Sequence, residues 1–309
     1  MSDEILITSY EDQDLDGTAC MFAYAEFLNG QGKKIYPAIS GIIQKEAQFV
    51  LDKFSIEGFV NLEEKLKDQK IILVDTSELE GLSSLIKPDQ VIEVIDHRKS
   101  HDVGKFPQAK AQIELVGSCA TLIAEKFYNN QVNISKESVV LLYSAIVSNT
   151  VNFQAKVTTD RDIKMAEWLK NKIKLPQDYV HQMFINKSQF DKPLEQVILG
   201  DMAFYVFDNK KISIAQLEMV EVDKFFANNL QELKNVLQKI KIDEKNDFIF
   251  LSCIDIEKGF NKFLVIDKDT EKIVRDILNI DFVDSVAKRE GILMRKEILP
   301  LVKEYFGKI

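Results

Sequence analysis

Short apolar segments alternate with helix-like segments through the first hundred positions, and this alternation constrains the fold more than any other feature. Apolar runs of the kind that buried parallel strands require occupy residues 5–7, 71–74 and 91–95. Helical periodicity occupies residues 19–28, 44–54 and 79–86. Because repeated strand–helix–strand units form right-handed crossovers, the alternation predicts an α/β fold with a doubly wound, mostly parallel sheet.

Acidic side chains follow three of the predicted strands. They are Asp14 with Asp16, Asp75, and Asp96 with its neighbour His97. The carboxyl ends of parallel strands meet at one edge of a sheet, where ligands bind. Carboxylates that converge there repel one another unless a cation lies between them. Asp and His side chains suit divalent ions such as Mn²⁺ or Mg²⁺, so the pattern predicts a metal site.

The residues around this predicted site add two further expectations. Arg98 directly follows Asp96 and His97, which favours an anion bound beside the metal. A strand over residues 113–116 leads to Gly117, and Ser118 can cap a following helix, a junction that can cradle a phosphate. A strongly apolar helix over residues 137–147 then delivers Asn149.

The chain changes character near residue 187. Residues 187–194 are polar, include Pro193 and are typical of an interdomain linker. Beyond them we expect a hairpin over residues 203–219 and a long amphipathic helix over residues 222–240. A second strand pair is expected over residues 248–267 and a terminal helix over residues 295–306. The predicted organisation is a domain of residues 1–186, a linker of residues 187–194 and a smaller α+β domain of residues 195–309. We expect the active site in the cleft between the domains.

Charge and composition narrow the class of ligand. The formal net charge of −9 and a pI near 5.1 disfavour a protein that binds nucleic-acid duplexes, which needs a basic face, but they allow a small anionic phosphate substrate at a metal site. No apolar run reaches the ~20 residues of a membrane span, and the first residues lack the basic start of a signal peptide. We therefore expect a cytoplasmic protein that does not bind membranes, and a homodimer is compatible with this picture. The three cysteines are widely spaced and are expected to be buried free thiols.

These motifs together resemble a DHH-type phosphoesterase. The resemblance rests on Asp14-Leu15-Asp16, the strand-end Asp75, Asp96-His97-Arg98 and the segment from Gly117 to Thr121, in that order over roughly residues 4–160. The remaining chain resembles the second type of DHH-associated domain, found in manganese-dependent family II inorganic pyrophosphatases and in exopolyphosphatases. Arg98, in place of a second histidine, is most similar to the prune-like exopolyphosphatase branch.

The resemblance implies a set of roles for individual residues. Two divalent ions are expected, Mn²⁺ first and Mg²⁺ or Co²⁺ as alternatives. Asp14 would bind one ion and Asp16 the other, Asp75 would bridge them, and His97 would ligate the second, with Asn149 where the family has a metal-binding Asp. Asp75, His97 and Arg98 would be catalytic. The residues that would contact substrate phosphate are Arg98, Lys187, Arg295 and Lys296.

The sequence departs from the pyrophosphatase pattern at three more positions. Tyr10 stands where that pattern has a histidine, Gln13 where it has a proline, and Asn149 where it has an acid. These changes predict weaker metal binding at one or both sites.

The function that the sequence favours is metal-dependent hydrolysis of phosphoanhydride bonds in pyrophosphate or short-chain polyphosphate. One alternative is a phosphodiesterase that acts on short oligonucleotides or cyclic dinucleotides, although the glycine-rich GGH-like motif of such enzymes is absent from the sequence. Another is a catalytically weakened module that binds a phosphate ligand.

Overall fold

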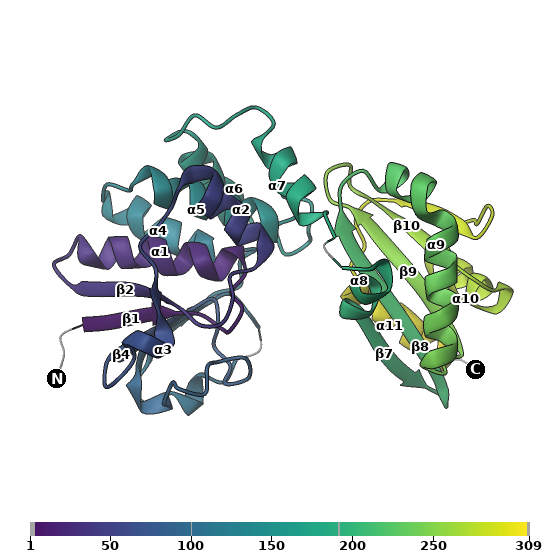
Figure 1. The fold of residues 1–309 in the computed structure, drawn as a ribbon, viewed down its shortest axis with the longest axis horizontal. Helices are drawn as coiled ribbons and strands as arrows, with labels where there is room; N and C mark the ends of the chain where they lie inside the picture. Colours follow the sequence, from purple (N-terminus) through teal and green to yellow (C-terminus); the bar gives the residue numbers. More distant parts are fainter. Residues whose placement is uncertain (1–3, 100, 191, 308–309) are drawn as a thin grey trace. The chain divides into compact units, whose positions relative to one another are not determined.

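The computed structural model describes residues 4–99, 101–190 and 192–307. The chain divides into two compact units, Met1–Asn186 and Lys187–Ile309. Each unit has its own sheet and its own core (Figure 1).

The sheet of the first unit has six strands, all parallel. Their order is β3-β2-β1-β4-β5-β6. The strands are β1 (Glu4–Thr8), β2 (Lys34–Ile39), β3 (Val60–Asn61), β4 (Lys70–Val74), β5 (Val91–Asp96) and β6 (Lys110–Ile113). The predicted α/β class with a parallel sheet is confirmed. The chain order reverses between β1 and β4, the position where sheets of this kind bind ligands at the carboxyl ends of the strands.

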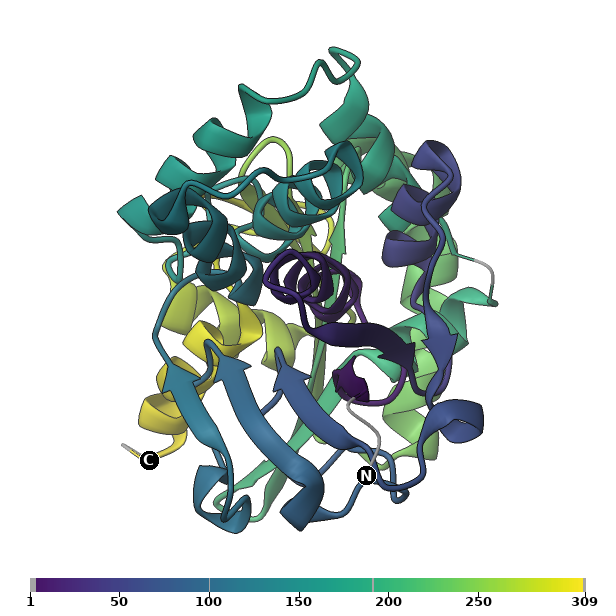
Figure 2. The same ribbon diagram turned by 90° about the vertical axis from the view of Figure 1, so that its left-hand side faces the viewer.

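Helices of the first unit gather mainly on one side of this sheet. In both views α1 (Leu15–Asn29), α4 (Cys119–Asn130) and α5 (Lys136–Asn149) lie on the same side (Figure 1; Figure 2). The helix α1 is apolar almost all round, because it packs between the sheet and the helices α4 and α5. The remaining helices are α2 (Lys45–Phe54), α3 (Leu62–Lys65), α6 (Asp160–Lys170) and α7 (Tyr179–Lys187).

Two local predictions in the first unit are wrong. Residues 79–86 form turns instead of a helix, because Gly81 adopts a φ of +82° and so short a segment gains few helical hydrogen bonds. The strand predicted over residues 113–116 ends at Ile113. After Ile113 the chain leaves the sheet, and this departure brings the carbonyl of Val116 toward the end of β5.

The second unit is a five-stranded mixed sheet between helices. Its order is β11-β10-β9-β8-β7, with β8 and β9 parallel and the other pairs antiparallel. The strands are β7 (Met202–Phe207), β8 (Lys210–Met219), β9 (Phe248–Asp255), β10 (Phe260–Val265) and β11 (Val286–Glu290). The helices are α8 (Leu194–Gly200), α9 (Val222–Asp243), α10 (Lys268–Leu278) and α11 (Arg295–Gly307). The predicted hairpin, long helix, strand pair and terminal helix are confirmed.

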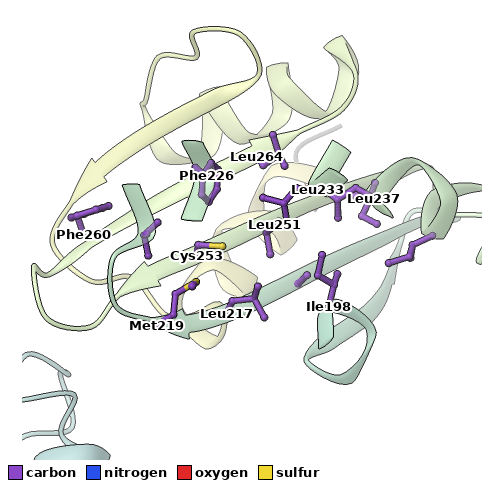
Figure 3. Close-up of a cluster of buried hydrophobic side chains, with 14 residues drawn as sticks. Ile198, Leu217, Met219, Phe226, Leu233, Leu237, Leu251, Cys253, Phe260 and Leu264 are labelled. Carbon is purple, nitrogen blue, oxygen red and sulfur yellow. The ribbon is translucent and has the colours of Figure 1, made fainter. Parts of the chain in front are cut away.

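Alternation along the strands gives this sheet two apolar faces. Leu217 and Leu251 belong to the core under α8 and α9, which Figure 3 shows, whereas Ile214 and Phe250 belong to the opposite core with α11. Among the described residues no helix is long and apolar enough to cross a membrane. All three cysteines are free and buried, as predicted.

Candidate metal centre

Asp75 ends β4 with a buried carboxylate. Its backbone adopts a φ of +55°, and its N–H donates to the carbonyl of Ile95 on β5, so the residue is fixed at the strand end. The side chain is 1% exposed. Its Oδ1 atom accepts no hydrogen bond from the described residues when His97 is neutral. A buried carboxylate oxygen without a donor is costly, and a bound cation would remove that cost.

His97 faces this oxygen from the end of β5. Its Nδ1 atom lies 2.9 Å from the carbonyl oxygen of Val116, which fixes Nδ1 as a hydrogen-bond donor and leaves Nε2 as the lone-pair atom of the neutral ring. The Nε2 atom is 3.3 Å from Oδ1 of Asp75 and 3.8 Å from Oδ2 of Asp16. Lone-pair atoms that face one another in this way form a fitting set of ligands for a divalent cation.

Asp16 completes the group from the first turn of α1. The ligand atoms of Asp16, Asp75 and His97 all lie within 4.8 Å of one another. The strand-end convergence expected from the sequence therefore occurs for these three residues. Two carboxylates and one imidazole form a set of ligands that suits Mn²⁺ and similar divalent ions.

The carboxylate of Asp16 occupies the N-terminus of α4. Its oxygens accept from the hydroxyl of Ser118 at 2.9 Å and from the backbone N–H groups of Cys119 and Ala120, both at 2.8 Å. The side chain of Asn149 donates to the same carboxylate at 2.5 Å. The expected phosphate cradle at residues 117–121 is therefore wrong, because the donors of this helix end hold Asp16 instead.

Burial and mutual repulsion perturb the ionisation of the metal-free group. Burial, followed by the charges of Asp16 and Asp14, raises the pKa of Asp75 well above its usual range. Burial likewise raises the pKa of Asp16. Burial alone would lower the pKa of His97, but its hydrogen bond to Asp75 and the charges of Asp16 and Asp75 outweigh burial and raise this pKa to about 11. Without metal, a proton on Nε2 therefore bridges His97 and Asp75.

Asp14 lies beside this group without joining it. It caps α1, where its Oδ1 accepts from the N–H of Gly17 at 2.9 Å, and it is partly exposed. The neighbouring Tyr10 is a neutral phenol, because burial and the charge of Asp14 raise its pKa. A neutral phenol is a much poorer metal ligand than an imidazole, so the position of Tyr10 offers no replacement for the histidine of the pyrophosphatase pattern.

Arg98 lies near the carboxylate oxygen of Asp75 that does not face His97. Its Nη2 atom is 3.9 Å from Oδ2 of Asp75, and its guanidinium carbon is 5.4 Å from the centre of the Tyr10 ring. Its Nε atom is 3.9 Å from Oδ1 of Asp96. The Arg98 side chain is 39% exposed at this edge, and its guanidinium can donate to a phosphate.

Asp96 does not contact the imidazole of His97, although it directly precedes this residue in the chain. Its oxygens accept from the backbone N–H of His97, at 2.7 Å, and from the hydroxyl of Ser77. The carbonyl of Val116 orients the ring instead. Asp96 therefore fixes the backbone of the strand end.

A buried aspartate that the sequence reasoning missed holds the loop that carries Val116. Asp162 accepts from the backbone N–H of Gly117 at 2.9 Å, from the hydroxyl of Thr121 at 2.6 Å, and from both the N–H and the hydroxyl of Thr159 at 2.7 Å. A Cβ atom at position 117 would come within 3.0 Å of Asp162, which explains the glycine. The capping-box pattern from Thr159 to Asp162 was a usable sequence signal.

The predicted substrate residues of the second unit have their own local partners. Lys187 lies 4.0 Å from Glu218. Arg295 lies 3.0 Å from the carboxylate of Asp201 and donates to the backbone carbonyl of the same residue at 2.5 Å. Lys296 is exposed at the start of α11. Their contact with a substrate stays a prediction.

Replacing Asn149 by Asp tests its place in the group. In Asn149→Asp a second carboxylate would face Asp16 across the present hydrogen bond, so we expect the metal-free protein to lose about 1–3 kcal/mol of unfolding free energy. With saturating Mn²⁺ the new oxygen ligand should recover most of this loss. Thermal unfolding in chelator and in Mn²⁺ measures both effects. An equal loss in both conditions would show that Asn149 lies outside the metal site.

Mn²⁺ binding should strengthen as pH rises. The raised pKa of His97 means that the metal-free site holds a proton on Nε2 up to a pH of about 11, and a metal must displace it. If one proton is released, the apparent affinity for Mn²⁺ should increase roughly tenfold for each pH unit between pH 6 and 8. Calorimetry in two buffers of different ionisation enthalpy counts the protons. Binding without proton release would contradict the assignment of a proton to Nε2 of His97 in the metal-free site.

Comparison with known proteins gives a consistent result over the whole chain. Residues 4–146 match the family described as "DHH family, N-terminal domain". A probable manganese-dependent inorganic pyrophosphatase of Clostridium acetobutylicum is 29% identical over 315 residues, covering 100% of each chain. A manganese-dependent inorganic pyrophosphatase of Methanothrix thermoacetophila is 29% identical over 319 residues, again with 100% of each chain.

Two solved structures resemble this chain over nearly their full length. A candidate family II inorganic pyrophosphatase of Methanococcus jannaschii has a TM-score of 0.66 and 26% identity, covering 98% of this chain and 99% of that one. An exopolyphosphatase-related protein of Bacteroides fragilis has a TM-score of 0.53 and 15% identity, covering 99% and 92%. The second likeness concerns the fold alone.

Proposed function

We propose that this chain, whose residues 4–146 match the DHH family N-terminal domain, is a divalent-metal-dependent hydrolase of phosphoanhydride bonds. Its substrate would be inorganic pyrophosphate or short-chain polyphosphate. The observation that carries the proposal is the group of Asp16, Asp75 and His97, in which the buried carboxylate of Asp75 faces an imidazole nitrogen at 3.3 Å. Full-length similarity to manganese-dependent inorganic pyrophosphatases supports Mn²⁺ as the metal.

Different residues of the chain would bind the metal and the phosphate in this hydrolysis. Asp16, Asp75 and His97 would hold the metal, which when bound polarises phosphoryl oxygens and lowers the pKa of an attacking water. Arg98 is partly exposed beside them and would donate to the oxygens of the phosphate, offsetting the charge that develops as the P–O bond breaks. The water oxygen bonds to phosphorus, and the second phosphate leaves with the bridging oxygen.

The second unit is proposed as the substrate-binding domain. Lys187, Arg295 and Lys296 would supply further positive charge to the phosphate chain. A cytoplasmic location, the absence of nucleic-acid binding and a homodimeric assembly belong to the same proposal. Size-exclusion chromatography with light scattering tests the assembly.

Phosphate release tests the proposed function. Purified protein with Mn²⁺, Mg²⁺ or Co²⁺ should release phosphate from pyrophosphate or tripolyphosphate, and it should leave a cyclic dinucleotide intact. His101→Asn is a suitable control, because His101 is an exposed histidine outside the metal group. Absence of phosphate release with every ion and both substrates would reject the proposal. Cleavage of the dinucleotide alone would favour the phosphodiesterase alternative.

A further inference from the structure

The two oxygens of Asp75 face different positive partners. Its Oδ1 atom faces His97 Nε2 at 3.3 Å, on the side of the three-residue metal group. Its Oδ2 atom faces Arg98 Nη2 at 3.9 Å, so one side of the carboxylate already has a permanent cation nearby. The two sides of this carboxylate are therefore not equivalent for metal binding.

Arg98 is held on its side of Asp75 by contacts that do not involve a metal. The Tyr10 ring lies 5.4 Å from the guanidinium carbon, and Asp96 Oδ1 lies 3.9 Å from Nε. Asp96 is itself fixed by Ser77 and by the backbone N–H of His97. A divalent ion bound to Oδ2 of Asp75 would lie close to this guanidinium, and the two cations would repel each other.

We propose that the protein without substrate holds one divalent ion, on Asp16, Asp75 and His97, and that Arg98 delays a second ion until a phosphate anion arrives. This inference rests on the proposed function and specifies the order in which the two metal ions bind to the protein. A phosphate chain binds the guanidinium through paired hydrogen bonds and draws its charge away from Asp75. Oδ2 of Asp75 and the partly exposed Asp14 then become available to an ion that the substrate phosphates also hold.

Such coupling is reciprocal. If the phosphate anion tightens binding of the second ion, the second ion tightens binding of the phosphate anion by the same factor. The first ion should bind independently of phosphate, because Arg98 lies near Asp75 Oδ2, Asp96 and Tyr10, whereas His97 Nε2 faces Asp75 Oδ1 and Asp16. The site would thus respond to the metal complex of the substrate rather than to the free anion.

Counting bound Mn²⁺ tests this inference without measuring turnover. Metal-free wild-type protein is dialysed against excess Mn²⁺ with or without imidodiphosphate, an analogue that resists hydrolysis. The bound metal is then measured by elemental analysis, and electron paramagnetic resonance distinguishes isolated from coupled ions. We expect one uncoupled Mn²⁺ per chain without the analogue and two coupled ions with it.

Two substitutions at one position separate charge from packing. Arg98→Lys keeps a cation and should still bind one ion in the absence of the analogue. Arg98→His removes the permanent charge, offers an imidazole and should bind two. Two ions in unliganded wild-type protein, or one ion in Arg98→His, would overturn the inference. Two ions in a wild-type protein that hydrolyses pyrophosphate overturn only this inference, whereas no bound ion together with no phosphate release overturns the proposed function as well.

Discussion

Asp75→Asn should lower the rate of phosphate release at least ~10³-fold, which corresponds to about 4 kcal/mol in the activation barrier. The change keeps the shape of the side chain and removes the charge of the central metal ligand. The same variant should be more stable than wild type when metal is absent. Burial raises the pKa of Asp75, so the folded metal-free protein binds the Asp75 proton more tightly than the unfolded chain does. The stability from this difference is fully present below the ordinary pKa of ~3.9 and is lost as pH rises toward the raised pKa.

Thermal unfolding at pH 7, with and without Mn²⁺, measures the effect of Asp75→Asn on stability and on stabilisation by the metal. Wild-type protein at 100 times the Kd should gain about 2.7 kcal/mol from the metal, and Asp75→Asn should gain less than ~1 kcal/mol. Asp68→Asn is the matched control, because Asp68 is exposed in the turn before the same strand. A variant that lost activity and yet gained the full stabilisation from Mn²⁺ would place the metal elsewhere.

Asp162→Ala should lower the unfolding free energy by about 3 kcal/mol. The substitution leaves the N–H groups of Gly117 and Thr159 and the hydroxyl of Thr121 without their buried acceptor. The loop from Gly117 also carries the carbonyl of Val116 that orients His97, so Mn²⁺ affinity should fall by roughly 10–100-fold. Asp162 thus acts as a positioning residue through the loop.

Chemical denaturation and a Mn²⁺ titration at a temperature where the variant is folded separate these two effects. Asp160→Ala is the matched control, since Asp160 is exposed in the first turn of the same helix and should cost less than ~1 kcal/mol through the helix dipole. Asp162→Asn keeps one acceptor oxygen and should lie between. Lost stability with unchanged Mn²⁺ affinity would contradict the positioning role.

The sequence was sufficient to predict the sheet and the three metal-facing residues, for a physical reason. Parallel strands bring their carboxyl ends to one edge, so the short-range pattern of an apolar run followed by an acid also places Asp75 and His97 in space. Asp16 follows because α1 begins directly after the turn that leaves β1. These positions depend on local pattern and on one general rule of sheet topology.

The residues that orient the site depend on contacts between distant segments. The path of the chain after Ile113 decides that Val116, and not Asp96, meets the imidazole. Asp16 fills the N-terminus of α4 from more than a hundred positions away in the sequence, as its bonds to Cys119 and Ala120 show. No periodicity or motif encodes such pairings. The sequence therefore predicted a phosphate at the N-terminus of α4, where the structure has the Asp16 carboxylate.

The most direct test of the central proposal is the position of bound Mn²⁺. Crystals of wild-type protein grown with Mn²⁺, under conditions in which the protein releases phosphate from pyrophosphate, would be measured at the manganese absorption edge. We predict an anomalous peak in coordination contact with Oδ1 of Asp75, Nε2 of His97 and a carboxylate oxygen of Asp16. An anomalous peak elsewhere in the protein, with none beside Asp75, would contradict the proposal.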